Sequence, residues 1–133
     1  MTKNKIIVTI FIAAISLSGC GTTALQRLSG ASFSAKQVET LVLPKWNAKC
    51  TATIAVCNKE NKSQSECTEY LTCDKNRHLF ITALIGVHTG VAQGAPLATL
   101  EKYDVTTIVD ITLKALQNVY DLATEAGFLG KVK

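Results

Sequence analysis

The sequence predicts a mainly α-helical domain of three or four helices, with a disulfide-stapled hairpin or loop between them. Three observations predict this fold class. Residues 105–126 show the apolar periodicity of an amphipathic helix, and residues 79–92 form an apolar segment that fits a buried helix. Residues 50–73 contain four cysteines, an even number typical of a disulfide framework. An α+β domain is the alternative, because residues 51–56 fit a strand.

The first helix is predicted to begin at Ser34. Ser34 is a favourable N-cap residue, and Gln37 three positions later completes a capping box. Pro44 is predicted to end this helix, because a proline disfavours helical geometry at the residue before it. Residues 20–33 are therefore interpreted as a tether, and residues 34–133 as a small disulfide-containing globular domain.

A short strand is predicted over Thr51–Val56, where β-branched residues are frequent. Residues 58–66 are polar and charged, which indicates an exposed loop. Trp46, the only tryptophan, is expected in the core beneath the cysteines rather than as a ligand platform.

The four cysteines allow three disulfide pairings. The nested one pairs Cys57 with Cys67 and Cys50 with Cys73, which suits a hairpin closed over the polar loop. On strands, however, Cys50 and Cys57 would face opposite sides while Cys67 and Cys73 share one, so a bulge or a helical return segment is required. Zinc and redox chemistry are the weaker alternatives, because no C-x-x-C pair is present.

The apolar segment 79–92 is predicted to be the central, buried helix of the domain. Its polar and small residues gather on one side: Thr82, Gly86, Thr89, Gly90 and Gln93. Gly86, Gly90 and Gly94 recur every fourth residue, a pattern that lets another backbone approach closely. Close packing must compensate for these glycines, since each costs about 1 kcal/mol relative to alanine in a helix. A strand pair broken at Gly86 is the competing structure, and a turn is predicted at residues 94–96.

The clearest element is the last helix, residues 105–126. Its apolar residues form one broad arc and its charged residues the other, with Thr112 as the one misfit. Gly127 is predicted to provide the C-cap, with Phe128 and Leu129 behind it.

The N-terminus has the pattern of an export signal. Lys3 and Lys5 precede an uncharged apolar run, Ile6–Ile15, which is shorter than the roughly 20 residues that span a bilayer. The next residues, Leu17-Ser18-Gly19-Cys20, resemble the lipobox of bacterial lipoproteins, which is a leucine, two small residues and an invariant cysteine.

This resemblance covers the leader alone. It implies that residues 1–19 are a lipoprotein signal peptide, that Cys20 carries diacylglycerol and an acylated amine, and that residues 20–33 are a lipidated tether. Gly21, in place of the aspartate that favours inner-membrane retention, implies an outer-membrane protein facing the periplasm. The alternative is an ordinary signal peptide followed by a buried or disulfide-bonded Cys20.

Composition argues against nucleic acid as a partner. Without Lys3 and Lys5, 12 basic residues remain against 10 acidic ones, a net charge of +2, and no dense basic cluster is present. The 114 residues that follow the leader are enough for one domain with a modest core.

No catalytic motif for a nucleophile, a metal or a phosphate is recognisable. His78 and His88 would point about 80° apart on one helix, which is poor for shared metal binding. His88 is expected to pack against a backbone carbonyl rather than act as a ligand or general base. No cofactor or metal is predicted, and an enzyme is the least favoured class.

The preferred function is a membrane-anchored interaction module that binds another envelope protein. Pilotins, exclusion proteins and toxin-immunity lipoproteins are analogies of architecture. An inhibitor or structural lipoprotein without a dedicated partner is the alternative. The apolar arc of the last helix covers about 200°, wider than the roughly 100° that one core requires. The edge formed by Ile111, Leu113 and Leu122 is therefore the candidate partner-binding surface, and acylated Cys20 the contact with the lipid bilayer.

Overall fold

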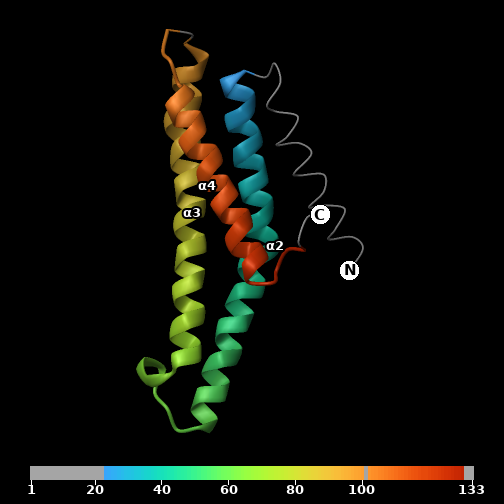
Figure 1. Cartoon of the computed structure of the whole chain (residues 1–133), viewed down its shortest axis with the longest axis vertical. Helices are drawn as coiled ribbons and strands as arrows, with labels where there is room; N and C mark the ends of the chain where they lie inside the picture. The colour runs from blue at the N-terminus through green and yellow to red at the C-terminus, as the bar shows by residue number, and fades with distance from the viewer. Residues whose placement is uncertain (1–22, 101, 131–133) are drawn as a thin grey trace.

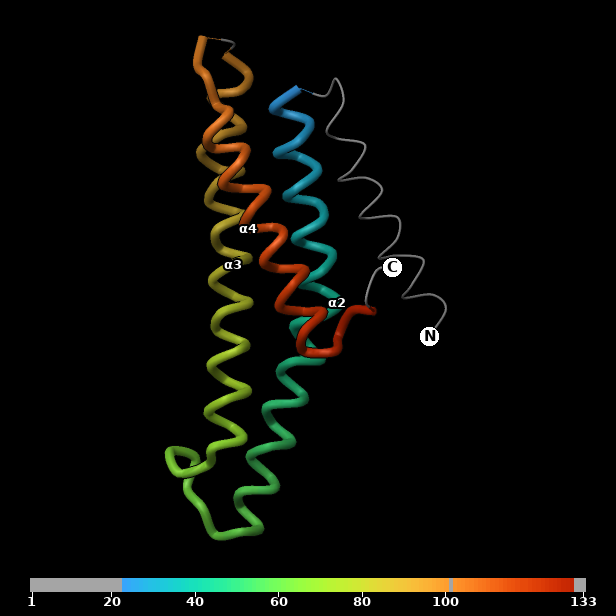
Figure 2. The backbone as a smooth tube through the Cα atoms, viewed as in Figure 1, coloured from blue at the N-terminus to red at the C-terminus, as the bar shows by residue number. Residues whose placement is uncertain are grey.

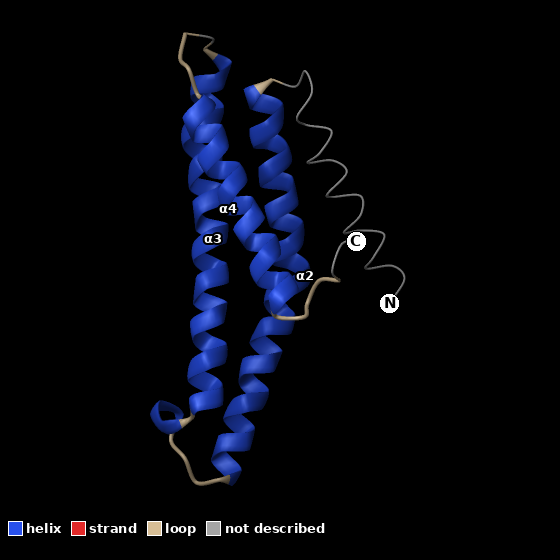
Figure 3. Ribbon diagram, viewed as in Figure 1, coloured by secondary structure: helices blue, strands red, loops and turns tan. Residues whose placement is uncertain are grey.

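The structure is a computed structural model that describes residues 23–100 and 102–130. Three long helices form an antiparallel bundle: α2 (Ala24–Lys59), α3 (Thr68–Thr99) and α4 (Thr106–Glu125), with a short 3-10 helix, η1 (Gln64–Glu66), between α2 and α3. α4 covers one half of the α2–α3 hairpin and leaves the other half as a two-helix arm (Figure 1). The mainly α prediction is confirmed, and the described residues contain no strand (Figure 3).

Helix α2 begins earlier than predicted. Thr23 is its N-cap: the Gln26 amide donates to the Thr23 hydroxyl at 3.2 Å, and the Thr23 amide donates to the Gln26 side chain at 3.0 Å. The predicted start at Ser34 and the tether over residues 20–33 are therefore wrong for the described residues, since Ser34 is buried within the helix. A periodic apolar face that starts upstream outweighs the local capping signal; its residues are Leu28, Ala31, Ala35, Val38 and Val42.

The predicted end of this helix at Pro44 is also wrong, because α2 continues to Lys59. A proline inside a helix removes one hydrogen bond and crowds the preceding turn, at a cost of about 3 kcal/mol. Beyond it, Trp46 and Cys50 are both buried, and their burial offsets that cost. Helix α2 changes direction near its middle (Figure 2), as expected for an interior proline.

The strand predicted over Thr51–Val56 is instead part of α2. Cys50 and Cys57 are seven positions apart, or two helical turns, so both lie on one buried face. Continuation of that face outweighs the β-propensity of the residues between them, which is the usual result when tertiary packing opposes local preference. The disulfide-stapled hairpin is therefore a helical one.

Helix α3 contains the predicted helix 79–92 and extends through the turn predicted at residues 94–96, which is wrong. Its last turns are required for packing. Gly94 is buried, and a Cβ atom there would lie 2.8 Å from Leu28 and 2.9 Å from Ile108. The three helices therefore meet at this glycine.

The predicted close approach at the glycines is confirmed against α4. A Cβ atom on Gly90 would overlap the Thr112 side chain, and one on Gly86 would lie 3.3 Å from the Ala115 Cβ. Thr112, the misfit of the apolar arc, is fully buried, and its hydroxyl donates to the Ile108 carbonyl at 2.7 Å. A small polar residue fits here because it faces a glycine and its hydroxyl is satisfied within its own helix.

The predicted C-cap at Gly127 is confirmed. Gly127 has a φ of 82°, a left-handed conformation that glycine adopts without penalty. Its amide donates to the Thr124 carbonyl, and the Phe128 amide donates to the Ala123 carbonyl, each at 3.0 Å. These two bonds form a Schellman motif, which directs Phe128 back towards the core.

Trp46 lies in the core, as predicted, with 2% of its surface exposed. Its ring centroid is 5.1 Å from that of Phe80 in α3 and 5.1 Å from that of Phe128 behind α4. Tilted ring pairs at this distance are favourable beyond the area that they bury. The aromatic cluster therefore joins all three parts of the bundle at the point where α4 ends.

Candidate functional surfaces and the disulfide arm

The part of the hairpin beyond α4 is closed by two nested disulfides, and we call it the disulfide arm (residues 50–73). Cys50 bonds to Cys73 with a Cα–Cα distance of 5.5 Å, and Cys57 bonds to Cys67 at 5.7 Å. The nested pairing predicted from the sequence is confirmed. No bulge is needed, because both sides of the arm are helical where the outer bridge forms.

Glu69 lies beside the inner disulfide, a contact that sequence reasoning missed. One of its carboxylate oxygens is 3.5 Å from the Cys57 sulfur and 3.8 Å from the Cys67 sulfur. These three side chains have the atom types of a metal site, within 4.8 Å of one another. A cysteine binds zinc through its thiolate, however, and sulfurs joined in a disulfide offer none, so only the Glu69 carboxylate of these three groups could ligate a metal in the oxidised arm.

The arm carries exposed charges of both signs. Lys62 and Glu60 form a 3.1 Å ion pair, and its hydrogen bond raises the pKa of Lys62. Because both partners are exposed, the pair adds little stability. Arg77 is different: it bonds to Asp74 within α3, which raises the pKa of Arg77, and donates to Asn47 of α2 at 3.1 Å. It therefore joins the two helices just above the outer disulfide.

The two histidines lie apart and have different neighbours. The His88 side chain is partly exposed, with its Nε2 3.8 Å from the Glu39 carboxylate of α2. This differs from the expected packing against a backbone carbonyl. His78, by contrast, does contact a backbone carbonyl: its Nδ1 lies 3.1 Å from the Asp74 carbonyl oxygen. The His88–Glu39 pair is not part of the group of metal-ligand side chains found among the described residues, which lies at the inner disulfide.

The three residues of the predicted partner-binding edge do not form one surface. Ile111 is 60% exposed, whereas Leu113 and Leu122 are partly buried and pack against the core. Ile111 and Leu113 are two positions apart, about 200° around a helix, so they lie on opposite flanks of α4. Only Ile111 remains accessible enough to meet a partner.

A larger exposed surface lies on α3. Six exposed residues follow one another at spacings of three and four, which places them on one helical face: Thr82, Ile85, Thr89, Ala92, Pro96 and Thr99. We call this the outer face of α3. No Asp, Glu, Lys or Arg occurs between Leu79 and Leu100, and Ile85 is 58% exposed.

The helix predicted over residues 79–92 as the central, buried one is buried on only part of its circumference, because its outer face is exposed. Only 28% of the most apolar stretch of α3 is buried. The long charge-free run is visible in the sequence, but it is compatible with a buried helix and with a partly exposed one. By length and composition alone, α3 is also able to cross a membrane, a test that the core helix of a soluble protein also passes.

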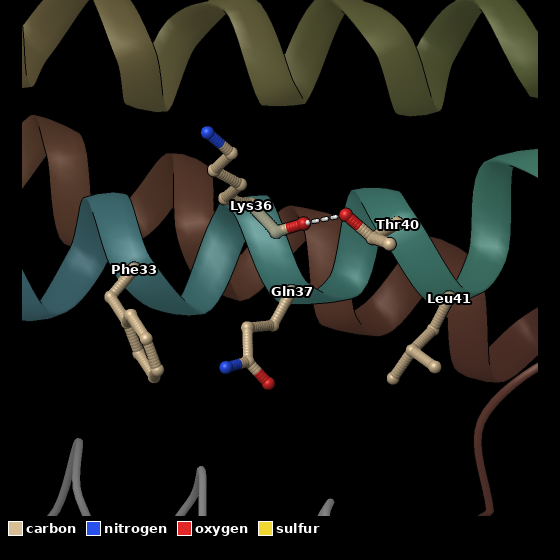
Figure 4. A pocket seen from close by; sticks show the side chains of 5 residues that line it. All are labelled: Phe33, Lys36, Gln37, Thr40 and Leu41. Carbon is tan, nitrogen blue, oxygen red and sulfur yellow. Dashed lines mark hydrogen bonds between the residues drawn. The ribbon is translucent and has the colours of Figure 1, made fainter.

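Helix α2 has a smaller site on its own outer side, a pocket of about 380 Å³. Phe33, Gln37 and Leu41 point to the same side of the helix, one turn apart, while Lys36 points away from them (Figure 4). The Thr40 hydroxyl donates to the Lys36 carbonyl at 2.8 Å. Two apolar side chains, Phe33 and Leu41, therefore flank the Gln37 amide in this pocket.

One buried hydroxyl stands out among the described residues. The Tyr120 hydroxyl has no hydrogen-bond partner of good geometry. Burial raises the pKa of Tyr120, and the nearby Ser34 hydroxyl of α2 partly opposes that shift. Both residues are almost fully buried, so a weak polar contact between α2 and α4 is the simplest role for them.

Cys20, the predicted lipidation site, lies outside the described residues. Comparison with known proteins identifies no relative: no family model, no curated protein and no solved structure matches this chain.

Proposed function

We propose that the protein is a lipoprotein of the bacterial envelope, cleaved after residue 19 and acylated on Cys20. The Leu17–Cys20 lipobox and the short apolar leader support this proposal. Two or three acyl chains would hold it durably on a membrane. Gly21 favours the outer membrane, with the helical domain in the periplasm.

We further propose that the domain binds another envelope protein and does not turn over a substrate. The observation that carries this proposal is the exposed, charge-free outer face of α3. Protein surfaces are usually rich in charged residues of both signs, and extended apolar surfaces mark interaction sites. The outer side of α4 provides the contrast, since it carries Asp110, Lys114 and Asp121.

The chemistry of this face suits a helix or a flat apolar surface. Spacings of three and four are those of helix–helix seams, and small residues allow a close approach. Burying it would require almost no desolvation of charge, which is the main cost of burying a polar surface. Ile85 is its largest exposed side chain and the expected centre of the contact.

The test is capture of the partner from intact envelope. The acylated protein is crosslinked in cells, purified, and its bound proteins identified for wild type, Ile85→Asp and Ile111→Asp. Ile85→Asp is expected to remain folded and to lose at least about tenfold of the captured partner, because a buried unpaired charge costs more than about 1.4 kcal/mol.

Ile111→Asp is the matched control, since Ile111 is equally exposed but lies on α4. Circular dichroism checks that both variants fold. Loss of the partner in Ile111→Asp alone would move the interface to α4. Full capture by both variants would contradict a partner at either surface and favour an inhibitor or structural role.

Pilotin-, exclusion- and immunity-like roles remain analogies of architecture. The genes beside this one would separate them, because secretion, conjugation and toxin genes each indicate a different partner.

A further inference from the structure

The two ends of the bundle differ in their distance from Cys20. Helix α2 begins at Ala24, and its N-cap, Thr23, is fixed by the capping box with Gln26. Only three residue steps separate Cys20 from Thr23, and an extended chain covers at most about 11 Å in three steps. An acylated Cys20 would therefore hold the start of α2 within about 11 Å of the lipid.

The connection between α3 and α4 lies at this same end of the bundle (Figure 1). Its described residues carry two exposed large side chains: Leu100 is 56% exposed and Tyr103 is 55% exposed. Leu25, in the first turn of α2, is exposed as well, and so is Lys102. The end nearest Cys20 therefore presents two leucines, a tyrosine and a lysine.

These side chains have the chemistry of a membrane–water interface. Tyrosine has an apolar ring with a polar tip and is enriched at the headgroup level of membranes. A lysine there attracts the phosphates of anionic lipids. The nearby carboxylate of Asp104 already accepts hydrogen bonds from the Thr106 amide and hydroxyl, at 3.0 and 2.6 Å.

We propose that this end of the bundle is a second membrane contact, in which Leu100 and Tyr103 insert into the headgroup region of the bilayer that holds the acyl chains. The inference rests on the proposed acylation of Cys20. The short stretch from Cys20 to Thr23 leaves these side chains close to that bilayer. The bundle then stands on its end, with the outer face of α3 directed sideways and the disulfide arm pointing away from the membrane.

The experiment places a tryptophan at chosen positions of the full-length acylated protein. The protein is reconstituted into vesicles of phosphatidylethanolamine and phosphatidylglycerol whose acyl chains carry bromine, which quenches tryptophan at short range. Leu100→Trp and Tyr103→Trp report on the proposed contact. Ile85→Trp reports on the middle of α3, and Leu71→Trp on the exposed surface of the disulfide arm. Wild type, which contains only the buried Trp46, provides the background.

The expected result is a blue shift and loss of emission for the tryptophans at positions 100 and 103, with emission at 85 and 71 unchanged. Equal quenching at 85 and 103 would overturn the proposal, because α3 would then lie in or along the bilayer. Vesicle-bound protein without quenching at 100 and 103 would also overturn it while leaving acylation intact.

Two further outcomes are decisive. A blue shift that requires added envelope protein, with no quenching by lipid, would assign this end to a protein partner and overturn the proposal. Protein released from the vesicles with the mass of an unmodified chain would overturn both the acylation and the second contact. The capture experiment with Ile85→Asp is read separately, so failure of the partner proposal does not affect this result.

Discussion

The two halves of the bundle are held together in different ways. In the three-helix half, glycines on α3 allow α4 to approach closely, and Thr112 fills the space in front of Gly90. In the disulfide arm, two helices alone cannot enclose a core, and covalent bridges hold them together. The association of α2 with α3 therefore depends on noncovalent packing at one end of the hairpin and on disulfide formation at the other.

The largest expected effect is in the three-helix half. Gly90→Leu should destabilise the fold by about 3 kcal/mol or more, because even a Cβ atom at this position overlaps Thr112. Urea unfolding monitored by circular dichroism measures the loss. Gly30→Ala is the matched control: Gly30 lies in α2 with no atom within 4 Å of an added Cβ, so the change should stabilise by about 0.5–1 kcal/mol. Equal effects of the two changes would contradict the close α3–α4 contact.

The next effect concerns the disulfide arm. Cys50→Ser with Cys73→Ser should cost about 3 kcal/mol, because that bridge closes a loop with a sequence separation of 23. Cys57→Ser with Cys67→Ser should cost somewhat less, since its separation is 10. Urea midpoints of the two oxidised variants test this order. Four free thiols in the denatured, unreduced wild type would remove the basis of the comparison.

The smallest effect lies at the end of the three-helix half nearest Cys20. Hydrogen bonds from the Thr106 hydroxyl and amide lower the pKa of Asp104. A carboxylate with a lowered folded-state pKa contributes stability that is present above its unfolded pKa, near 3.9, and lost as the pH falls through the lower folded value. Thermal melts between pH 5 and about pH 2 should therefore show a slightly larger acid-dependent loss of stability in wild type than in Asp104→Asn. Parallel curves would mean that Asp104 does not hold the start of α4.

The features that could be predicted from the sequence have strong local signals. The apolar arc of α4 and the αL glycine at Gly127 each depend on a few neighbouring residues. The Gly86–Gly94 repeat also indicated the close helix contact, although not which helix would make it. The nested disulfides followed from the polar loop between Cys57 and Cys67.

The predicted ends of α2 were wrong where a local capping or proline signal opposed a longer apolar periodicity. Ser34 resembles the start of a helix and Pro44 its end. The buried apolar face, however, continues from Leu28 to Trp46 across both positions, and so does the helix. The outer face of α3 was missed for another reason. Sequence alone does not reveal which sides of α3 the other described helices cover, so an exposed charge-free face and a buried one look the same.

The length of α2 determines how far the tip of the disulfide arm stands from the membrane. A helix of 36 residues rises about 54 Å, slightly less when bent as α2 is. With its first turn held at the membrane as proposed, the charged tip around Lys62 would stand about 50 Å into the periplasm, while Ile85 lies at an intermediate depth. A partner on the outer face of α3 would then be met between the membrane and the tip, and shortening both α2 and α3 by two turns would lower the tip by about 11 Å.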